Sequence, residues 1–458
     1  MKLKVLVIFL IILLSGEAFG AERDRRIEEE KRLTLQETEQ RVLEKEDRFA
    51  FDWGGWINHR FDNYHNDDND RLTEDVIDHT NSIDTRLWLK AVLRNPLDSS
   101  GEFEHSLYIR LKDYYIHRRP DDNDRDGPHL DYAYLTLDFQ PLWFRLGRGY
   151  FDVGRGIACS NVNDGAELFL IIPKWKFNLF LSQTLPHEDN IDISVPGYDK
   201  ESDRVFYGFE STYFLNETNN VYGFFLMQRD SSDEDPENTS QDYTYDSEYT
   251  GVGVDGEAWG KIKYWGEFIM QTGQSYTTGT NEQRDISAWA GNVGIKYETE
   301  VYSHPAVSFE YALGSGDPDR SSVTNTQNGN TSGDDNNFLY FGYIETGYAL
   351  SPLLSNLEFY KLQASFKPLE QCQIFKRLTM DISYYLYRKD EETGAIYDLD
   401  ATENDADIGK EIDVRIFWQA FSDLSFEVQY GHFYPGDAYP ASTNDSEEYL
   451  AFSTSLAF

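Results

Sequence analysis

The stretch NSIDTRLWLKAVLRN, residues 81–95, alternates apolar side chains with polar or charged ones. Leu87 and Leu89 fall on one face of a strand with this spacing, and Arg86 and Lys90 fall on the other. One face therefore suits hydrocarbon and the other suits ions in water. The pattern predicts a sheet that separates these two environments.

The same alternation recurs from Phe49 to the end of the chain and predicts eighteen strands. An additional strand within 337–350 is left open. The expected strands lie near 49–62, 81–94, 102–116, 130–140, 142–150, 165–172, 175–184, 203–215, 220–230, 247–257, 260–274, 284–299, 304–316, 358–367, 377–388, 408–420, 423–434 and 447–458.

Long polar connections follow the odd strands, and short turns follow most of the even strands. A soluble β-sandwich has no reason to place every long loop at one end, whereas an outer-membrane barrel has long outside loops and short periplasmic turns. Closing the sheet also satisfies the edge hydrogen bonds, as a bilayer demands. We therefore predict an all-β fold, a transmembrane antiparallel up-and-down β-barrel of about eighteen strands, with long extracellular loops and short periplasmic turns.

Composition supports export to a membrane. The chain has 458 residues, 15% aromatic residues and a formal net charge of −40, yet its mean hydropathy is only −0.60. Its one long apolar run, LVIFLIILL at 6–14, follows two lysines and precedes a small-x-small site.

Three segments are expected in the chain. Residues 1–20 are predicted to be a signal peptide, with an uncleaved anchor as the alternative. Residues 21–48 are predicted to be a charged helical or disordered periplasmic lead, with a coiled coil as the alternative, and residues 49–458 the transmembrane barrel.

Basic residues fall on the inward faces of several strands. They are Arg86, Lys90, Arg94, Arg110, Lys112, Arg145, Lys361 and Arg415. A conduit lined with one sign of charge selects permeants of the other sign, and arginine matches carboxylates well. The alternative is that these bases pair with lumenal acids such as Asp84, Glu267 and Glu427 and stiffen the wall.

Aromatic and acidic residues suggest two further sites. Trp88, Tyr108 and Trp265 are lumenal candidates for contact with sugar rings, although packing in the wall is an alternative. Asp122, Asp124 and Asp126 begin a calcium-loop pattern in an expected extracellular loop, but the final glutamate of that pattern is missing. No other cofactor is expected.

Cysteine and histidine patterns give little support for chemistry. Cys159 and Cys372 are expected at opposite ends of the barrel and should not pair. No serine-nucleophile motif, metal-binding histidine pair or phosphate-binding glycine loop is found. The prediction is that the protein is not an enzyme, with an outer-membrane barrel hydrolase as a remote alternative.

Three motifs resemble the bacterial alginate-export outer-membrane porins. They are LWFRLGRGYFDVGRG at 142–156, YALGSGDPD at 311–319 and SNLEFYKLQASFKP at 355–368. The resemblance implies an eighteen-stranded barrel that exports a polyuronate. It also assigns motif positions to Arg148, as a lumenal base, and to Asp317. Gly149 departs from the pattern, since the family often has an amide there.

We therefore predict a channel of the bacterial outer membrane that exports an anionic, alginate-like polysaccharide through a basic lumen. A general or anion-selective diffusion porin for small solutes or oligosaccharides is the alternative. The expected partners are outer-membrane lipid and lipopolysaccharide, the anionic polysaccharide, the barrel-assembly machinery and periplasmic polysaccharide-export components, with no nucleic acid.

Overall fold

The computed structural model describes residues 49–66, 69, 79–94, 104–118, 122–186, 191, 202–232, 245–276, 283–326 and 329–458. The signal peptide and the charged lead expected before Phe49 lie outside these residues, so both remain predictions. Among the described residues, no helix is long and apolar enough to cross a bilayer.

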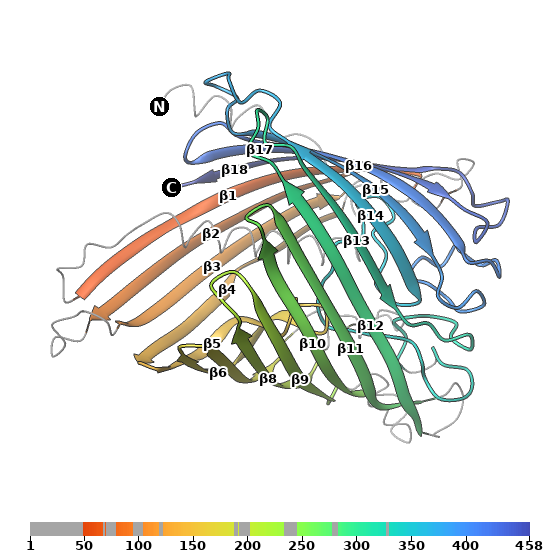
Figure 1. Cartoon of the computed structure of the whole chain (residues 1–458), viewed down its shortest axis with the longest axis horizontal. Helices are drawn as coiled ribbons and strands as arrows, with labels where there is room; N and C mark the ends of the chain where they lie inside the picture. Colours follow the sequence, from red (N-terminus) through yellow and green to blue (C-terminus); the bar gives the residue numbers. More distant parts are fainter. Residues whose placement is uncertain are drawn as a thin grey trace.

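Eighteen antiparallel strands form one closed sheet (Figure 1). Each strand pairs with its neighbours in the chain, and β18 pairs with β1 to close the barrel. The strands are β1 (Phe49–His65), β2 (His79–Arg94), β3 (Glu104–Arg118), β4 (Asp122–Phe139), β5 (Leu142–Asp152), β6 (Ser160–Ile172), β7 (Trp175–Gln183), β8 (Arg204–Phe214), β9 (Asn220–Asp230), β10 (Asp246–Ala258), β11 (Ile262–Tyr276), β12 (Gln283–Glu298), β13 (Ala306–Gly314), β14 (Leu357–Phe366), β15 (Leu378–Arg388), β16 (Asp407–Gln419), β17 (Leu424–Pro435) and β18 (Glu447–Ala457).

The predicted fold class and strand number are confirmed. The long connection expected at 117–129 is wrong: it is mostly strand, because β3 extends to Arg118 and β4 already begins at Asp122. Residues 337–350, where the sequence left an additional strand open, form no strand. Most other connections alternate between long and short as expected, but the β11–β12 connection, residues 277–282, is no longer than the β12–β13 connection, residues 299–305. The long β15–β16 and β17–β18 loops lie at the right-hand end of Figure 1.

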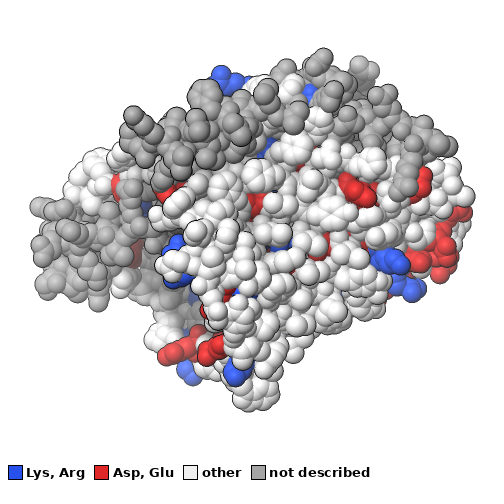
Figure 2. Space-filling view, turned by 90° about the horizontal axis from the view of Figure 1, so that it is seen from above, with Lys and Arg blue, Asp and Glu red and all other residues white. Residues whose placement is uncertain are grey.

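The two faces of the sheet differ as the sequence predicts. On the outward face of β2, Leu87 and Leu89 are 49% and 40% exposed. On its inward face, Arg86 is 2% exposed. Large apolar side chains are exposed on the outside of most strands. Figure 2 shows a mainly uncharged surface, with groups of charged residues at its right-hand end and at its lower left edge. This outer surface is suited to contact hydrocarbon.

Inward glycines let aromatic rings lie flat against the neighbouring strand. A Cβ at Gly294 of β12 would come within 2.1 Å of the Trp265 ring of β11, and one at Gly208 within 2.1 Å of the Phe180 ring. Real Cβ atoms do not approach carbon so closely. These glycines therefore give each ring a flat backbone surface on which to pack.

The cysteines lie as expected. Cys159 is buried in the connection between β5 and β6, Cys372 is exposed in the turn between β14 and β15, and both are free thiols. The prediction that they do not pair is confirmed.

Replacing Gly294 by alanine should destabilise the barrel by about 1–3 kcal/mol, because the added methyl group overpacks the Trp265 ring. Gly266→Ala is the matched control, since its Cβ would meet nothing closer than 3.6 Å. Urea unfolding followed by the shift of the folded band on unheated gels measures both variants. Equal midpoints for the two variants would contradict this packing.

Candidate functional site

The long connection between β13 and β14, residues 315–356, folds into the barrel. Its Leu339 amide donates to Gln271 Oε1 of β11 at 3.0 Å, and its Tyr348 amide donates to Glu411 of β16 at 2.6 Å. Gln271 and Glu411 are inward residues, with exposures of 1% and 0%, on strands that flank β13 and β14 on either side. The connection, named here the inner loop, therefore folds over the inner face of the arc β11–β16.

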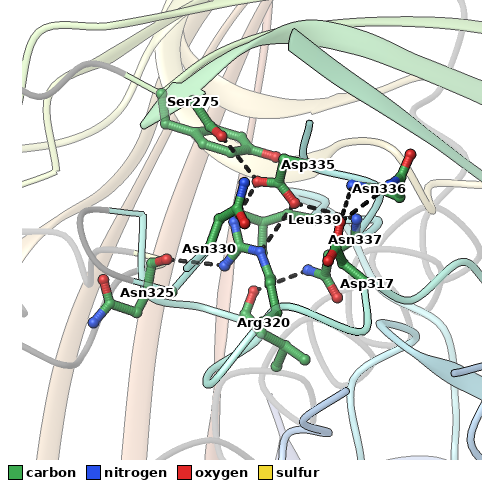
Figure 3. A network of polar contacts seen from close by, with 12 residues as sticks. Ser275, Asp317, Arg320, Asn325, Asn330, Asp335, Asn336, Asn337 and Leu339 are labelled. Carbon is green, nitrogen blue, oxygen red and sulfur yellow. Dashed lines mark hydrogen bonds and ion pairs between the residues drawn. The ribbon is translucent and has the colours of Figure 1, made fainter. Parts of the chain in front are cut away.

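A buried ion pair fixes the first part of the inner loop. The Arg320 guanidinium donates to both oxygens of Asp335, at 3.0 and 2.6 Å (Figure 3). Asp335 also accepts from Ser275 of β11 at 3.0 Å, and its backbone bonds to β12 through Asp285 and Ser287. Burial disfavours the Arg320 charge, but Asp335 outweighs this and raises its pKa.

The last part of the inner loop is held by one carboxylate. Glu411 accepts hydrogen bonds from three successive backbone amides, those of Tyr348, Ala349 and Leu350. The Tyr387 hydroxyl of β15 donates to the Thr346 carbonyl at 2.6 Å. Hydrogen bonds to an ionised acceptor are stronger than neutral ones, so this anchor is firm.

A second connection, residues 153–159 between β5 and β6, also folds inward. The backbone amide of Gly154 donates to Glu210 of β8, and that of Arg155 donates to Glu267 of β11, both at 2.8 Å. The two inward connections also bond to each other. The backbone amide of Phe341 donates to the Ala158 carbonyl at 3.0 Å, and the backbone amide of Tyr343 donates to the Gly156 carbonyl at 2.9 Å.

Aromatic packing fills the side of the lumen beside β8–β11. Phe341 contacts the rings of Phe206 and Tyr249, and Phe338 contacts Tyr249. The Tyr249 hydroxyl donates to the Leu339 carbonyl at 2.6 Å. These contacts attach the inner loop to one side of the wall, and the arc on the other side is β1–β5.

Between its two anchored parts the inner loop has a short arch, residues 342–345, whose side chains are half-exposed. Glu345 is the charged residue of this arch, and its Oε2 accepts from Lys361 Nζ of β14 at 2.9 Å. Burial would raise the pKa of Glu345, but Lys361 and Arg415 outweigh it and lower that pKa. Glu345 therefore stays ionised at lower pH than a free glutamate.

The inward orientation predicted for the basic residues is correct for those whose side chains are described, apart from Arg148. They are Arg86, Lys90, Arg110, Lys112, Arg145, Lys361 and Arg415, and each alternates with exposed apolar neighbours on its strand. The side chain of Arg94 lies outside the described residues.

Arg148 does not face the lumen. It lies on the face of β5 that carries the exposed Leu142 and Leu146, and it forms two 2.9 Å hydrogen bonds with Asp164 of β6. The position implied by the family motif is therefore wrong for this chain, because the parity of the strand turns Arg148 outward. Asp317, the other motif position, accepts a hydrogen bond from the backbone amide of Asn336 at 2.7 Å within the inner loop.

Most of the inward arginines are paired with carboxylates of the wall. Arg86 contacts Asp84 at 2.7 Å and Asp131 at 3.3 Å, and Arg110 contacts Asp131 at 2.5 Å. A β-bulge in β4 inserts Asp131 into this position. Both guanidiniums also lie over the Trp56 ring, at 5.7 and 5.2 Å from its centroid.

The remaining arginines show the same pairing. Arg145 pairs with Glu167, and Arg415 pairs with Glu427 at 3.0 Å. The alternative interpretation, in which inward bases pair with lumenal acids, is therefore right for these arginines. Within the described part of the chain, Lys90 and Lys112 form no ion pair, and Lys90 is exposed.

The predicted aromatic residues are packed into the wall. Tyr108 is 6% exposed and stacks between Trp88 and Tyr134, with centroids 6.2 and 5.2 Å away. Trp265 lies between Gly294 and the Arg155 guanidinium, which is 5.2 Å from its centroid. The faces of Tyr108 and Trp265 are therefore largely covered, as the packing alternative predicted.

The calcium prediction falls on a strand instead of a loop. Asp124 and Asp126 belong to β4 and pair in register with Ile116 and Tyr114, while the side chain of Asp122 is not described. No group of three or more metal-binding side chains is found among the described residues. Calcium binding stays a prediction.

Several inward charged residues were not predicted, among them Lys176, Arg155 and Glu345. Lys176 of β7 lies over the Phe169 ring at 5.3 Å, and its alternation with the exposed Leu179 could have indicated this. Arg155 and Glu345 lie in connections that fold inward, and no periodic signal exists in such segments.

The closed barrel, its apolar outer face and its polar interior define a porin-like β-barrel of the bacterial outer membrane. The family model described as alginate export matches residues 54–453, and the chain belongs to this family. No curated protein matches the chain.

Solved structures share the fold at low sequence identity. Pseudomonas aeruginosa OccK5 (OpdH) is 11% identical with a TM-score of 0.55, covering 89% of this chain and 98% of that one. P. aeruginosa OccK11 (OpdR) is 12% identical with a TM-score of 0.53, covering 91% and 100%. Acinetobacter baumannii OccAB1 is 10% identical with a TM-score of 0.55, covering 89% and 96%.

Replacing Asp335 by alanine should release the first part of the inner loop. Breaking a buried ion pair costs about 3–5 kcal/mol, and Arg320, which is 3% exposed, would become accessible to trypsin. Mass spectrometry of trypsin-treated folded barrels should show cleavage after Arg320 in the variant and protection in the wild type.

Asp334→Ala is the control, because Asp334 is the exposed neighbour of Asp335. Protection of Arg320 in the Asp335→Ala barrel would show that this ion pair does not fix the loop.

Proposed function

We propose that the protein is a passive outer-membrane channel for saccharides that carry carboxylates, an alginate-like polyuronate being the preferred substrate, and that it is not an enzyme. The observation that carries the proposal is the division of the lumen. The inner loop is attached to β11, β12 and β14–β16, and the arc β1–β5 on the other side carries Arg86, Lys90, Arg110, Lys112 and Arg145.

The unpaired lysines give this arc its attraction for anions. The arginines are largely neutralised by Asp84, Asp131 and Glu167, so they contribute a rigid wall that is close to neutral. Lys90 and Lys112 have no carboxylate partner among the described residues. In a narrow conduit with low-dielectric walls, even a few uncompensated charges set the sign of the preferred permeant.

The position of the inner loop in the lumen favours a slender permeant. Its two anchors and its hydrogen bonds to residues 153–159 hold it inside the lumen, which it narrows. A pore narrowed in this way favours a single extended chain over a compact solute of the same mass. Family membership supports the same substrate class, since the matching model describes alginate export.

A diffusion porin for small anionic solutes is the second candidate. The close balance of arginines and acids in the wall favours it, because a polymer with a charge on every sugar would gain more from an unbalanced basic wall. The two candidates differ in whether long polyuronates enter and occupy the pore.

Replacing Lys90, Lys112 and Lys176 together by glutamine should abolish anion preference. The reversal potential of single channels in a KCl gradient measures this preference, and polygalacturonate added to one side tests polymer entry through current block. We expect block of the wild type by polygalacturonate but not by dextran, and loss of block in the triple variant.

A triple glutamine variant of Lys261, Lys367 and Lys376, which lie in periplasmic turns, is the charge-matched control and should behave like wild type. Block by short uronates without block by the polymer would support the diffusion porin. Equal anion preference in both triple variants would contradict the proposed path.

A further inference from the structure

We infer that Lys361 and Glu345 form an exchangeable ion pair, in which Lys361 is a binding subsite for a carboxylate of the permeant and Glu345 occupies that subsite in the empty channel. This inference rests on the proposed function, because it assigns a site to the carboxylates of that substrate. The two partners come from different parts of the structure. Lys361 belongs to the wall, on β14, whereas Glu345 belongs to the arch of the inner loop.

The inward wall arginines described above have carboxylate partners that also belong to the wall. These partners are deeply buried, with side-chain exposures of 12% for Asp84, 7% for Asp131, 2% for Glu167 and 7% for Glu427. The Glu345 side chain is 31% exposed. It is therefore the carboxylate in this set that a solute can most readily replace.

The backbone around Glu345 permits such a replacement. On one side of Glu345, the backbone of Phe341 and Tyr343 bonds to residues 156, 158 and 160, and on the other side Thr346 bonds to Tyr387. Within the arch, Glu345 can turn its side chain away without breaking either anchor. The exchange then requires rotation of one side chain and no movement of the whole loop.

The surroundings of Lys361 favour exchange over addition of a second anion. Glu310 of β13 is the register partner of Lys361, and Glu345 already occupies the Lys361 ammonium. Glu310 is already satisfied by Trp265 and Asn292, at 3.2 and 2.8 Å. With these acids nearby, an extra carboxylate cannot join Glu345 at Lys361, so it must take the place of Glu345.

Exchange of one carboxylate for another suits a channel. The incoming group gains the hydrogen bond and charge contact that Glu345 loses, so the net binding free energy is small. Conduction requires a permeant to bind well enough to enter and weakly enough to leave. Glu345 would thus shorten the time that each uronate spends at Lys361.

The experiment compares wild type, Glu345→Gln, Lys361→Gln and Glu392→Gln in planar bilayers, with trigalacturonate as the probe. Glu392 is an exposed acid of the β15–β16 loop and controls for loss of one negative charge. Removing the competing carboxylate should lengthen the block of Glu345→Gln by about fivefold, because the carboxylate of the probe then has no rival at Lys361. Glu392→Gln should match wild type, and Lys361→Gln should shorten the block.

Glu345→Asp keeps the charge but withdraws the carboxylate, and it should give an intermediate block time; it also serves if Glu345→Gln fails to fold. Block times in Glu345→Gln equal to wild type, with block and anion preference otherwise present, would overturn the exchange alone. No block in wild type or any variant would overturn the proposed function together with this inference.

Discussion

Hydrogen bonding of the backbone in a medium without water is the constraint on which the rest of this structure depends. Hydrocarbon offers no partner to a peptide group, so each strand must pair on both sides. The ladder between β1 and β18, from Trp56 with Ala457 to His65 with Glu448, removes the last open edge. Once the sheet is closed, period two dictates that one face meets lipid and the other encloses an aqueous space.

That enclosed space is wide enough to need filling, and the chain fills it with two of its own connections. The inner loop and residues 153–159 bring backbone amides into the lumen, where they require acceptors. Glu210, Glu267 and Glu411, all inward wall residues, accept from them. Acids of the wall therefore position the loops, and the loops in turn determine which arc of the wall remains for a permeant.

The sequence predicted the strands and their faces because a local period of two carries that information. The same rule places Arg148 outward, since Leu142 and Leu146 share its parity, whereas the family motif implies a lumenal position. The D-x-D-x-D-G segment was assigned to a loop from its composition, but pairing with β3 holds it in a strand. Hydrogen bonding to a neighbour outweighed the local preference of aspartate and glycine for turns.

The ion pairs depend on information that no local pattern contains. Asp131 reaches Arg86 and Arg110 only because of a bulge in β4, and Glu345 reaches Lys361 only because its loop folds inward. The reversal potential of the wild-type channel in a KCl gradient reports which sign of charge lines the open path. We expect a potential displaced toward the chloride equilibrium value. A potential displaced toward the potassium value would contradict it, because the path would then follow the acids of the lumen instead of the basic arc.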